Sequence, residues 1–561
     1  MKHHYSPSRL LSALLLSAAA TGAAAQSAVV SFRGHTFDVN DVERIEFCDS
    51  AAMPPASAEL SDGLAALVAQ AGNLKIMSRL LVETGWAEKI RGGIDRQYDP
   101  TLYTGMEKLM AGTVPGLSIP AVRRTGHTLF LEPDAVLAQA WGVAPKLDAD
   151  GRITNWPDVL AVVKGRTEEA YGSGSGALTD ETNPVNRFVA AHIVPGAMRY
   201  DRLVVHYNEY NYNFGNDRTR PQTYYCPTNV WDYYATAGAC PRLLKVTQVG
   251  DQGFENDRDH KIYLNRISFY DNSRNGDYRE LGVEERGILV SAYNGEWPNV
   301  TDAGAYYIID RPLLFNETTN TWLASERIRA DFTTLLPDFI SSGLRHGAYS
   351  YLPAGFAGNV NMSEGTVLAY LHAGQDPLGG NLWSNYQGDE LYVAGNFDIT
   401  LPLPPVPKDG IYEVRLGTSH NAYRNIVQMF FSEDGINFMP VGGAYDQTEP
   451  AGADNIPWVA DTGNELTDAG NDRRLRSKGF MKAPKYFCMT GSTTSARDKG
   501  GSFPALRRIV GEFPMKAGKT YYLRFKALRT VGDIGSSTLF LDYVELCPAS
   551  VYNGLMGEDI W

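Results

Sequence analysis

The chain has 561 residues and a formal net charge of −13, which argues against nucleic acid or an anionic membrane surface as a partner. Its 31 tyrosines, 55 glycines and 30 prolines indicate many strands joined by elaborate loops. Two classes of protein stay open: an exported enzyme, and an exported binding or adhesion protein.

The first 25 residues have the pattern of a signal peptide. Lys2 and Arg9 precede the apolar run Leu10–Leu16, and small residues follow up to an A-x-A pattern at Ala23 and Ala25. No later stretch reaches the roughly 18 apolar residues that a membrane span needs. We therefore expect residues 1–25 to be a signal peptide, and the mature chain to be periplasmic, cell-surface or secreted without a transmembrane segment.

Five cysteines are spread along the chain. Cys226 and Cys240 bracket a short loop, so an oxidising environment predicts a disulfide between them. Pairing of Cys488 with Cys547 stays open. No cysteine or histidine spacing indicates a metal site, and we expect no cofactor.

The N-terminal third begins with a predicted hairpin in residues 26–50, around Arg33-Gly34, and a linker in residues 51–69. A helix follows in NLKIMSRLLVETGW, with Asn73 as its N-cap. Its spacing predicts four inward residues, which are Ile76, Met77, Leu80 and Leu81.

The segment TLFLEPDAVLAQAW predicts a strand at 129–131 and a helix that starts at Pro133-Asp134, which gives Asp134 a structural role. Another helix is expected in residues 157–171.

The helix in NPVNRFVAAHIVPG should be capped by Asn183 and end at Pro195-Gly196. His192 lies on its apolar face, where it could be a catalytic base, a metal ligand or a packed core residue. Because no serine, cysteine or carboxylate motif accompanies it, we predict a structural histidine whose ring nitrogens bond to backbone groups.

Four pieces resemble, in order, the fasciclin domain: NLKIMSRLLVETGW, TLFLEPDAVLAQ, NRFVAAHIVPG and DAGAYYIIDRPLL. The chain departs from that family's pattern in having Glu132 where proline is usual and Ala191 where tyrosine is frequent. The resemblance spans residues 70–316 and implies a mixed α/β domain that works in adhesion.

Residues 317–345 are expected to link this domain to a second one, at residues 346–561, where only strand patterns separated by turns appear. Asp434-Gly435 predicts a tight turn in the hairpin QMFFSEDGINFMPVGG, and TLFLDYVELCP predicts one terminal strand. The SEDGINF hairpin and the LDYVEL strand resemble the galactose-binding-like, discoidin-type jelly roll. The expected fold class is thus α+β multidomain, with a fasciclin-like mixed α/β domain followed by an all-β jelly-roll sandwich.

Aromatic and amide side chains gather in three stretches that could bind a sugar or a protein partner: HYNEYNYNFGND, WSNYQGDELY and SHNAYRN. Each could equally be an ordered surface loop without a ligand. The candidate binding residues in them are Tyr210, Tyr212, Trp383, Tyr386, Tyr423 and Arg424.

No nucleophile elbow, zincin, Walker or dinucleotide motif appears, although a pair of glycosidase carboxylates stays possible. We therefore expect no catalytic residues, and a non-enzymatic exported cell-envelope protein that mediates adhesion or binds an extracellular protein or glycan. Two alternatives stay open: glycan capture within a polysaccharide-utilisation system, and a glycan-active enzyme.

Overall fold

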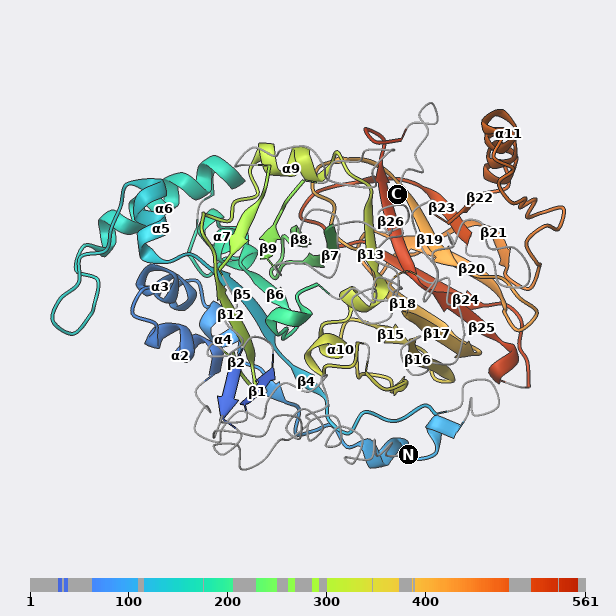
Figure 1. Cartoon of the computed structure of the whole chain (residues 1–561), viewed down its shortest axis with the longest axis horizontal. Coiled ribbons are helices and arrows are strands. Elements are labelled where there is room, and N and C mark those ends of the chain that lie inside the picture. The colour runs from blue at the N-terminus through green and yellow to red at the C-terminus, as the bar shows by residue number, and fades with distance from the viewer. Residues whose placement is uncertain are drawn as a thin grey trace, which may run out of the picture. The chain divides into compact units, whose positions relative to one another are not determined.

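The computed structural model (Figure 1) describes residues 29–32, 35–38, 63–108, 116–174, 176–204, 229–249, 261–267, 285–291, 300–345, 347–372, 386, 389–483, 506–532 and 534–552. The chain divides into two compact units, one formed by residues 1–52 and 294–296 and the other by the rest. In the first unit, β1 (Val29–Phe32) and β2 (His35–Asp38) form the antiparallel hairpin predicted around Arg33-Gly34. The expected signal peptide lies outside the described residues.

The N-terminal half of the second unit mixes helices with short strands. Its helices are α2 (Gly63–Gln70), α3 (Lys75–Glu83), α4 (Trp86–Lys89), α5 (Asp134–Trp141), α6 (Trp156–Tyr171) and α7 (Pro184–Ala191), with 3-10 turns η2 (Pro100–Tyr103), η3 (Met106–Lys108) and η4 (Tyr200–Arg202). One sheet has the order β11 (Val300–Thr301), β12 (Gly304–Ile308), β5 (His127–Leu131) and β6 (Ile193–Pro195). β12 runs parallel to β5, and β6 runs antiparallel to it.

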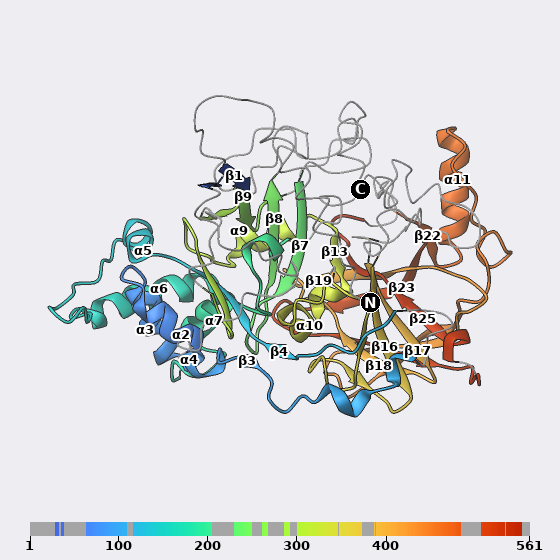
Figure 2. The same ribbon diagram turned by 60° about the horizontal axis from the view of Figure 1, so that its bottom comes forward.

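A second sheet in this half has the order β10 (Ile288–Val290), β9 (Lys261–Leu264), β8 (Leu243–Val249) and β7 (Asn229–Ala235), and β7, β8 and β9 lie side by side in Figure 2. β3 (Gly93–Ile94) pairs with β4 (Arg124–Thr125). The four apolar residues predicted to point inward from α3 are all buried in the core that these elements share.

The predicted N-cap of α3 was wrong. The helix begins at Lys75, and the carboxylate of Asp134 accepts from the backbone N–H groups of Lys75 (3.1 Å) and Ile76 (2.9 Å). The N–H of Asp134 in turn donates to the carbonyl of Asn73 at 2.8 Å. A side chain from α5 thus satisfies donors that every helix start leaves open. The structural role of Asp134 stays a prediction.

The helix α7 has the predicted Asn183 cap, which accepts from Val185 N–H at 2.9 Å. It is shorter than predicted, however, because it ends at Ala191 with His192 as its C-cap. Residues Ile193–Pro195 continue as β6, since they pair with β5 in the sheet.

The C-terminal half is built mainly of strands, in three sheets (Figure 1). The first has the order β13 (Ile328–Asp331), β26 (Tyr543–Pro548), β19 (Gly410–Thr418), β23 (Leu506–Met515) and β22 (Phe480–Lys482). The second has the order β15 (Asn361–Met362), β18 (Asp398–Pro402), β24 (Tyr522–Ala527), β20 (Ile426–Ser432) and β21 (Met439–Asp446). The third has the order β14 (Ser350–Leu352), β16 (Thr366–His372), β17 (Asp389–Gly395) and β25 (Thr538–Leu541).

Side chains from all three sheets form one hydrophobic cluster, as in a β-sandwich. The remaining elements of this half are α9 (Glu317–Leu323), η8 (Phe332–Leu335), α10 (Pro337–Ser341), α11 (Glu465–Arg476) and η12 (Ile534–Ser536). The expected link at 317–345 contributes β13, which pairs with β26. The domain boundaries on either side of that segment stay a prediction. β20 and β21 pair across the Asp434 turn as predicted.

The predicted terminal strand is two strands. β25 pairs with β17, whereas β26 pairs with β13 and β19, so the chain passes from one sheet to another at Asp542. The carboxylate of Asp542 accepts from the backbone N–H of Tyr386 at 3.0 and 2.9 Å. Burial raises the pKa of Asp542 well above its ordinary value.

Candidate functional site

The six predicted binding residues fall into two groups. Tyr210, Tyr212 and Trp383 lie outside the described residues, so their roles stay predictions. Tyr386, Tyr423 and Arg424 are described, and the structure gives each a different environment.

Tyr386 is half-buried. Its ring meets Tyr543 edge-on at 5.4 Å between centroids, and the guanidinium of Arg329 lies 5.5 Å from its centroid. Together with the bonds from its N–H to Asp542, these contacts hold the residue against the sheet. The observed environment is that of a packing residue, and a binding role for Tyr386 stays a prediction.

Tyr423 is 59% exposed, and a binding role for it stays a prediction. Its backbone is fixed on both sides of the residue. The N–H donates to Asn421 Oδ1 at 2.8 Å, and the carbonyl accepts from Thr538 Oγ1 at 2.9 Å. The loop 419–425, which we call the Tyr423 loop, therefore presents an aromatic ring to solvent from a fixed backbone.

Asn425 holds the end of the Tyr423 loop, and it is completely buried. Its Nδ2 donates to the carbonyl of Arg529 (2.9 Å) and to Ser537 Oγ. Its Oδ1 accepts from the N–H groups of Ile426 (2.6 Å) and Arg529 (3.1 Å). Because the Asn425 side chain is bonded on both polar atoms, the loop is tied to the segment before η12 and to Ser537, the residue that precedes β25.

Arg424 is a cation that is only 5% exposed. Its Nη1 donates to Thr538 Oγ1 and its Nη2 to Ser419 Oγ, both at 3.0 Å. The guanidinium also lies 5.1 Å from the ring centroids of Tyr392 and Phe540. These partners are hydroxyls and aromatic faces, so no described residue supplies a carboxylate to Arg424.

Two further arginines lie around the Tyr423 loop: Arg529 bonds to it, and the charge of Arg508 acts on His420. The Nη2 of Arg529 donates to the carbonyls of Arg424 (3.1 Å) and Ser536 (2.9 Å). The Nη1 of Arg508 donates to the carbonyls of Lys478 and Gly479, both at 3.1 Å. Neither has an acidic partner in the described part of the chain.

The histidine of the Tyr423 loop, His420, has a pKa below its ordinary value. Burial is the main cause that lowers the pKa of His420 to about 4, and the charges of Arg424 and Arg508 act in the same direction. The charge of Asp446 acts to raise the pKa of His420. The Asp446 carboxylate itself accepts from the N–H and the hydroxyl of Thr448, at 2.8 and 2.6 Å.

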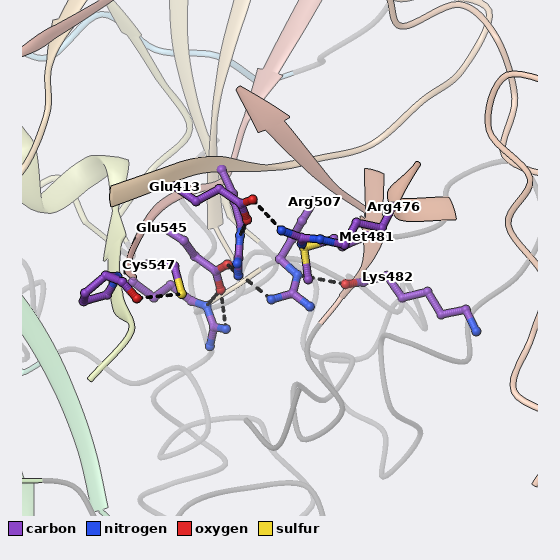
Figure 3. A network of polar contacts seen from close by, with 10 residues as sticks. Glu413, Arg476, Met481, Lys482, Arg507, Glu545 and Cys547 are labelled. Atoms are coloured by element: carbon purple, nitrogen blue, oxygen red, sulfur yellow. Dashed lines mark hydrogen bonds and ion pairs between the residues drawn. The ribbon is translucent and has the colours of Figure 1, made fainter. Parts of the chain in front are cut away.

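A second polar cluster lies on the strands β13, β19, β23 and β26 (Figure 3). Glu545 is its centre and accepts from Arg329 (2.8 and 2.5 Å), Arg507 (3.2 Å) and Arg415 (3.3 Å). Glu413 accepts from Arg415 Nε at 2.5 Å and from Arg476, which joins α11 to β19. In Figure 3 the labelled side chains of Glu413 and Arg476 point toward each other, and Glu545 lies beside Arg507.

This cluster contains two carboxylates and therefore bears on the enzyme alternative. Burial raises the pKa of Glu545, but the surrounding arginines outweigh it and hold that pKa well below the ordinary value. A general acid needs a pKa near the working pH and contact with substrate. Glu545 is ionised and fully buried, so it meets neither requirement. Its ion pairs instead connect strands of one sheet.

His192 is fully buried. Its Nδ1 contacts the carbonyl of Phe188 at 2.7 Å, as the prediction of a backbone partner required. Its Nε2 contacts Glu132 Oε1, also at 2.7 Å, and that oxygen accepts from Leu313 N–H at 2.8 Å. The carboxylate partner was missed because Glu132 was considered only as a departure from a family pattern. The structural role of His192 stays a prediction.

The expected disulfide is not supported. Cys240 is a free, half-buried thiol, and Cys226 lies outside the described residues. Cys240 instead packs beside the turn at Gly518, where an added Cβ would lie 3.5 Å from the Cys240 Cβ. Among the described residues, no cluster of histidine, cysteine and carboxylate groups could hold a metal ion.

The described helices include none with the length and apolar character that a bilayer crossing requires. No family model matches the chain, and no curated protein matches it. The fasciclin resemblance therefore has no support beyond the residues that suggested it.

Solved structures give distant likenesses. A Paenibacillus xanthan lyase is 11% identical over 57% of this chain and 22% of its own length, with a TM-score of 0.21. The K1 cleaved adhesin domain of Lys-gingipain from Porphyromonas gingivalis W83 is 11% identical over 39% and 97%, with a TM-score of 0.19. TmCBM61 in complex with beta-1,4-galactotriose is 13% identical over 33% and 86%, with a TM-score of 0.16. At these TM-scores the likenesses carry no argument.

Proposed function

We propose that the protein is a non-enzymatic exported binding protein of the cell envelope, and that its β-sandwich binds a glycan through the Tyr423 loop. The observation that supports this most is the exposure of Tyr423 on a backbone fixed by Asn421, Asn425 and Thr538. An aromatic ring offers a large apolar face with a polar edge, which suits the face of a sugar ring. A fixed loop also keeps the ordering entropy that binding requires low.

Adhesion to a protein partner is the second candidate function. It is supported by the resemblance of residues 70–316 to the fasciclin domain, in which case the α/β half makes the contact and the Tyr423 loop is silent. The wider expectation, adhesion or glycan capture outside the cell, is common to both candidates. A glycan-active enzyme is the least supported alternative, because the carboxylate pair Glu413 and Glu545 is committed to arginines.

A glycan array with the purified full chain tests the proposal. Tyr423→Ala should remove most of the signal for any glycan that the wild type retains. Ile436→Ala is the matched control, because Ile436 is 80% exposed and lies beyond the opposite end of β20. The proposal is wrong if no glycan is retained, or if the two variants behave alike. Cleavage of a retained glycan would favour the enzyme alternative.

A further inference from the structure

Three arginines around the Tyr423 loop have no carboxylate partner in the described part of the chain. Arg424, Arg508 and Arg529 bond only to hydroxyls and carbonyls there. The Nε atom of each of the three is buried and has no hydrogen-bond partner among the residues that the structure describes. A buried or half-buried cation is stabilised strongly by an anion, and arginine pairs especially well with carboxylate and sulfate groups.

Arg529 is the member of this group best placed to meet a ligand at Tyr423. It is half-buried, and its guanidinium bonds to the carbonyl of Arg424, the residue that follows Tyr423. Arg424 lies beneath the loop between Tyr392 and Phe540, and adds a second positive charge. The loop therefore combines an exposed aromatic ring with a half-buried cation that bonds to carbonyl groups and to no carboxylate in the described part of the chain.

We propose that the Tyr423 loop recognises an acidic glycan, with the sugar ring against Tyr423 and a carboxylate or sulfate group paired with Arg529. This inference rests on the proposed glycan-binding function and names its ligand class. The formal charge of −13 disfavours general attraction of polyanions. Binding of an acidic glycan would therefore point to a local site.

The test compares matched ligands on the full chain by isothermal titration calorimetry. Polygalacturonate and its methyl ester have the same sugar ring, but only the first is charged. Chondroitin sulfate and unsulfated chondroitin separate sulfate recognition from carboxylate recognition. We expect the wild type to bind at least one charged polymer roughly 10-fold or more tightly than its less charged counterpart, as a charge-assisted hydrogen bond implies.

Arg529→Gln should bring the ratio of the two Kd values close to one, because the positive charge that favours the charged polymer is lost. The ratio of the two Kd values is the readout, because a loosened loop would weaken both ligands together. Arg152→Gln is the control, since it makes the same charge change on a side chain that is 78% exposed in the α/β half.

The outcomes separate the two proposals. Tyr423-dependent binding of neutral glycans without a preference for charge would overturn the acidic-ligand inference and leave the proposed function standing. A preference that survives Arg529→Gln would also overturn the inference. Binding of no glycan, charged or neutral, would overturn both.

Discussion

Replacement of His192 by phenylalanine gives a sharp test of how the α/β half is held together. The ring of His192 contacts two oxygen atoms, and the Phe188 carbonyl can only accept. Nδ1 must therefore carry a proton, and a further proton lies between Nε2 and Glu132. With that proton on either atom, the pair has no net charge, and its exposed fraction is zero on both side chains.

Phenylalanine would keep the aromatic packing, because the His192 ring lies 4.5 Å from the Phe188 ring between centroids. It would remove the partner of the buried Glu132 carboxyl group, whose Oε2 already has no hydrogen bond among the described residues. Breaking a buried pair by removing one member destabilises by about 3–5 kcal/mol. We expect His192→Phe to lower the free energy of unfolding by about that amount, despite its conserved shape.

Urea unfolding of the full chain measures the effect, and Glu132→Gln completes a double-mutant cycle. On its own, Glu132→Gln should destabilise by about 1–3 kcal/mol, because it disturbs the same contact. In the His192→Phe background it should be neutral or stabilising, because it removes an unpaired carboxyl group. A His192→Phe protein as stable as the wild type, or effects that simply add, would refute the reasoning.

Three further predictions concern acid stability, the Tyr423 loop and the cysteines. Burial is the main cause that lowers the pKa of three histidines to about 4, from an ordinary 6.5: His127, His372 and His420. Below about pH 6.5 the unfolded chain therefore binds protons that the folded chain does not. The free energy of unfolding should be unaffected by these histidines above that pH and should fall as the pH approaches 4, by up to ~3 kcal/mol for each histidine. An unchanged melting temperature between pH 7 and 4.5 would contradict this. Asn425→Ala should lower the free energy of unfolding by about 2–4 kcal/mol because several buried hydrogen bonds are lost, and it should weaken glycan binding. Unchanged urea unfolding would contradict the role of Asn425 in fixing the Tyr423 loop. Cys240 should react with a maleimide without prior reduction, which peptide mapping can detect. A linked Cys226–Cys240 peptide would contradict the free thiol at Cys240.

The features that the sequence predicted correctly depend on neighbouring residues. The inward positions of α3 follow from helical spacing, the Asn183 cap from the residue before Pro184, and the hairpin turn from Asp434-Gly435. Each uses residues within a few positions of one another, so local propensity was enough.

The features that the sequence did not predict join distant parts of the chain. Asp134 caps a helix 59 residues earlier, Glu132 meets a histidine 60 residues later, and Arg529 bonds to a loop 105 residues earlier. The break at Asp542 escaped notice because apolar alternation continues through it, while the Tyr386 contact that marks it spans 156 residues. A single sequence carries no signal for such pairs.

The central claim is that Tyr423 forms the binding surface of the sandwich. Hydroxyl-radical footprinting of the full chain, with and without a glycan that it retains, tests this directly, because oxidation reports the exposure of individual side chains. We predict that the glycan protects Tyr423 and leaves Ile436 as reactive as before. Equal oxidation of Tyr423 in the free and the bound protein would contradict the claim and place the binding surface elsewhere.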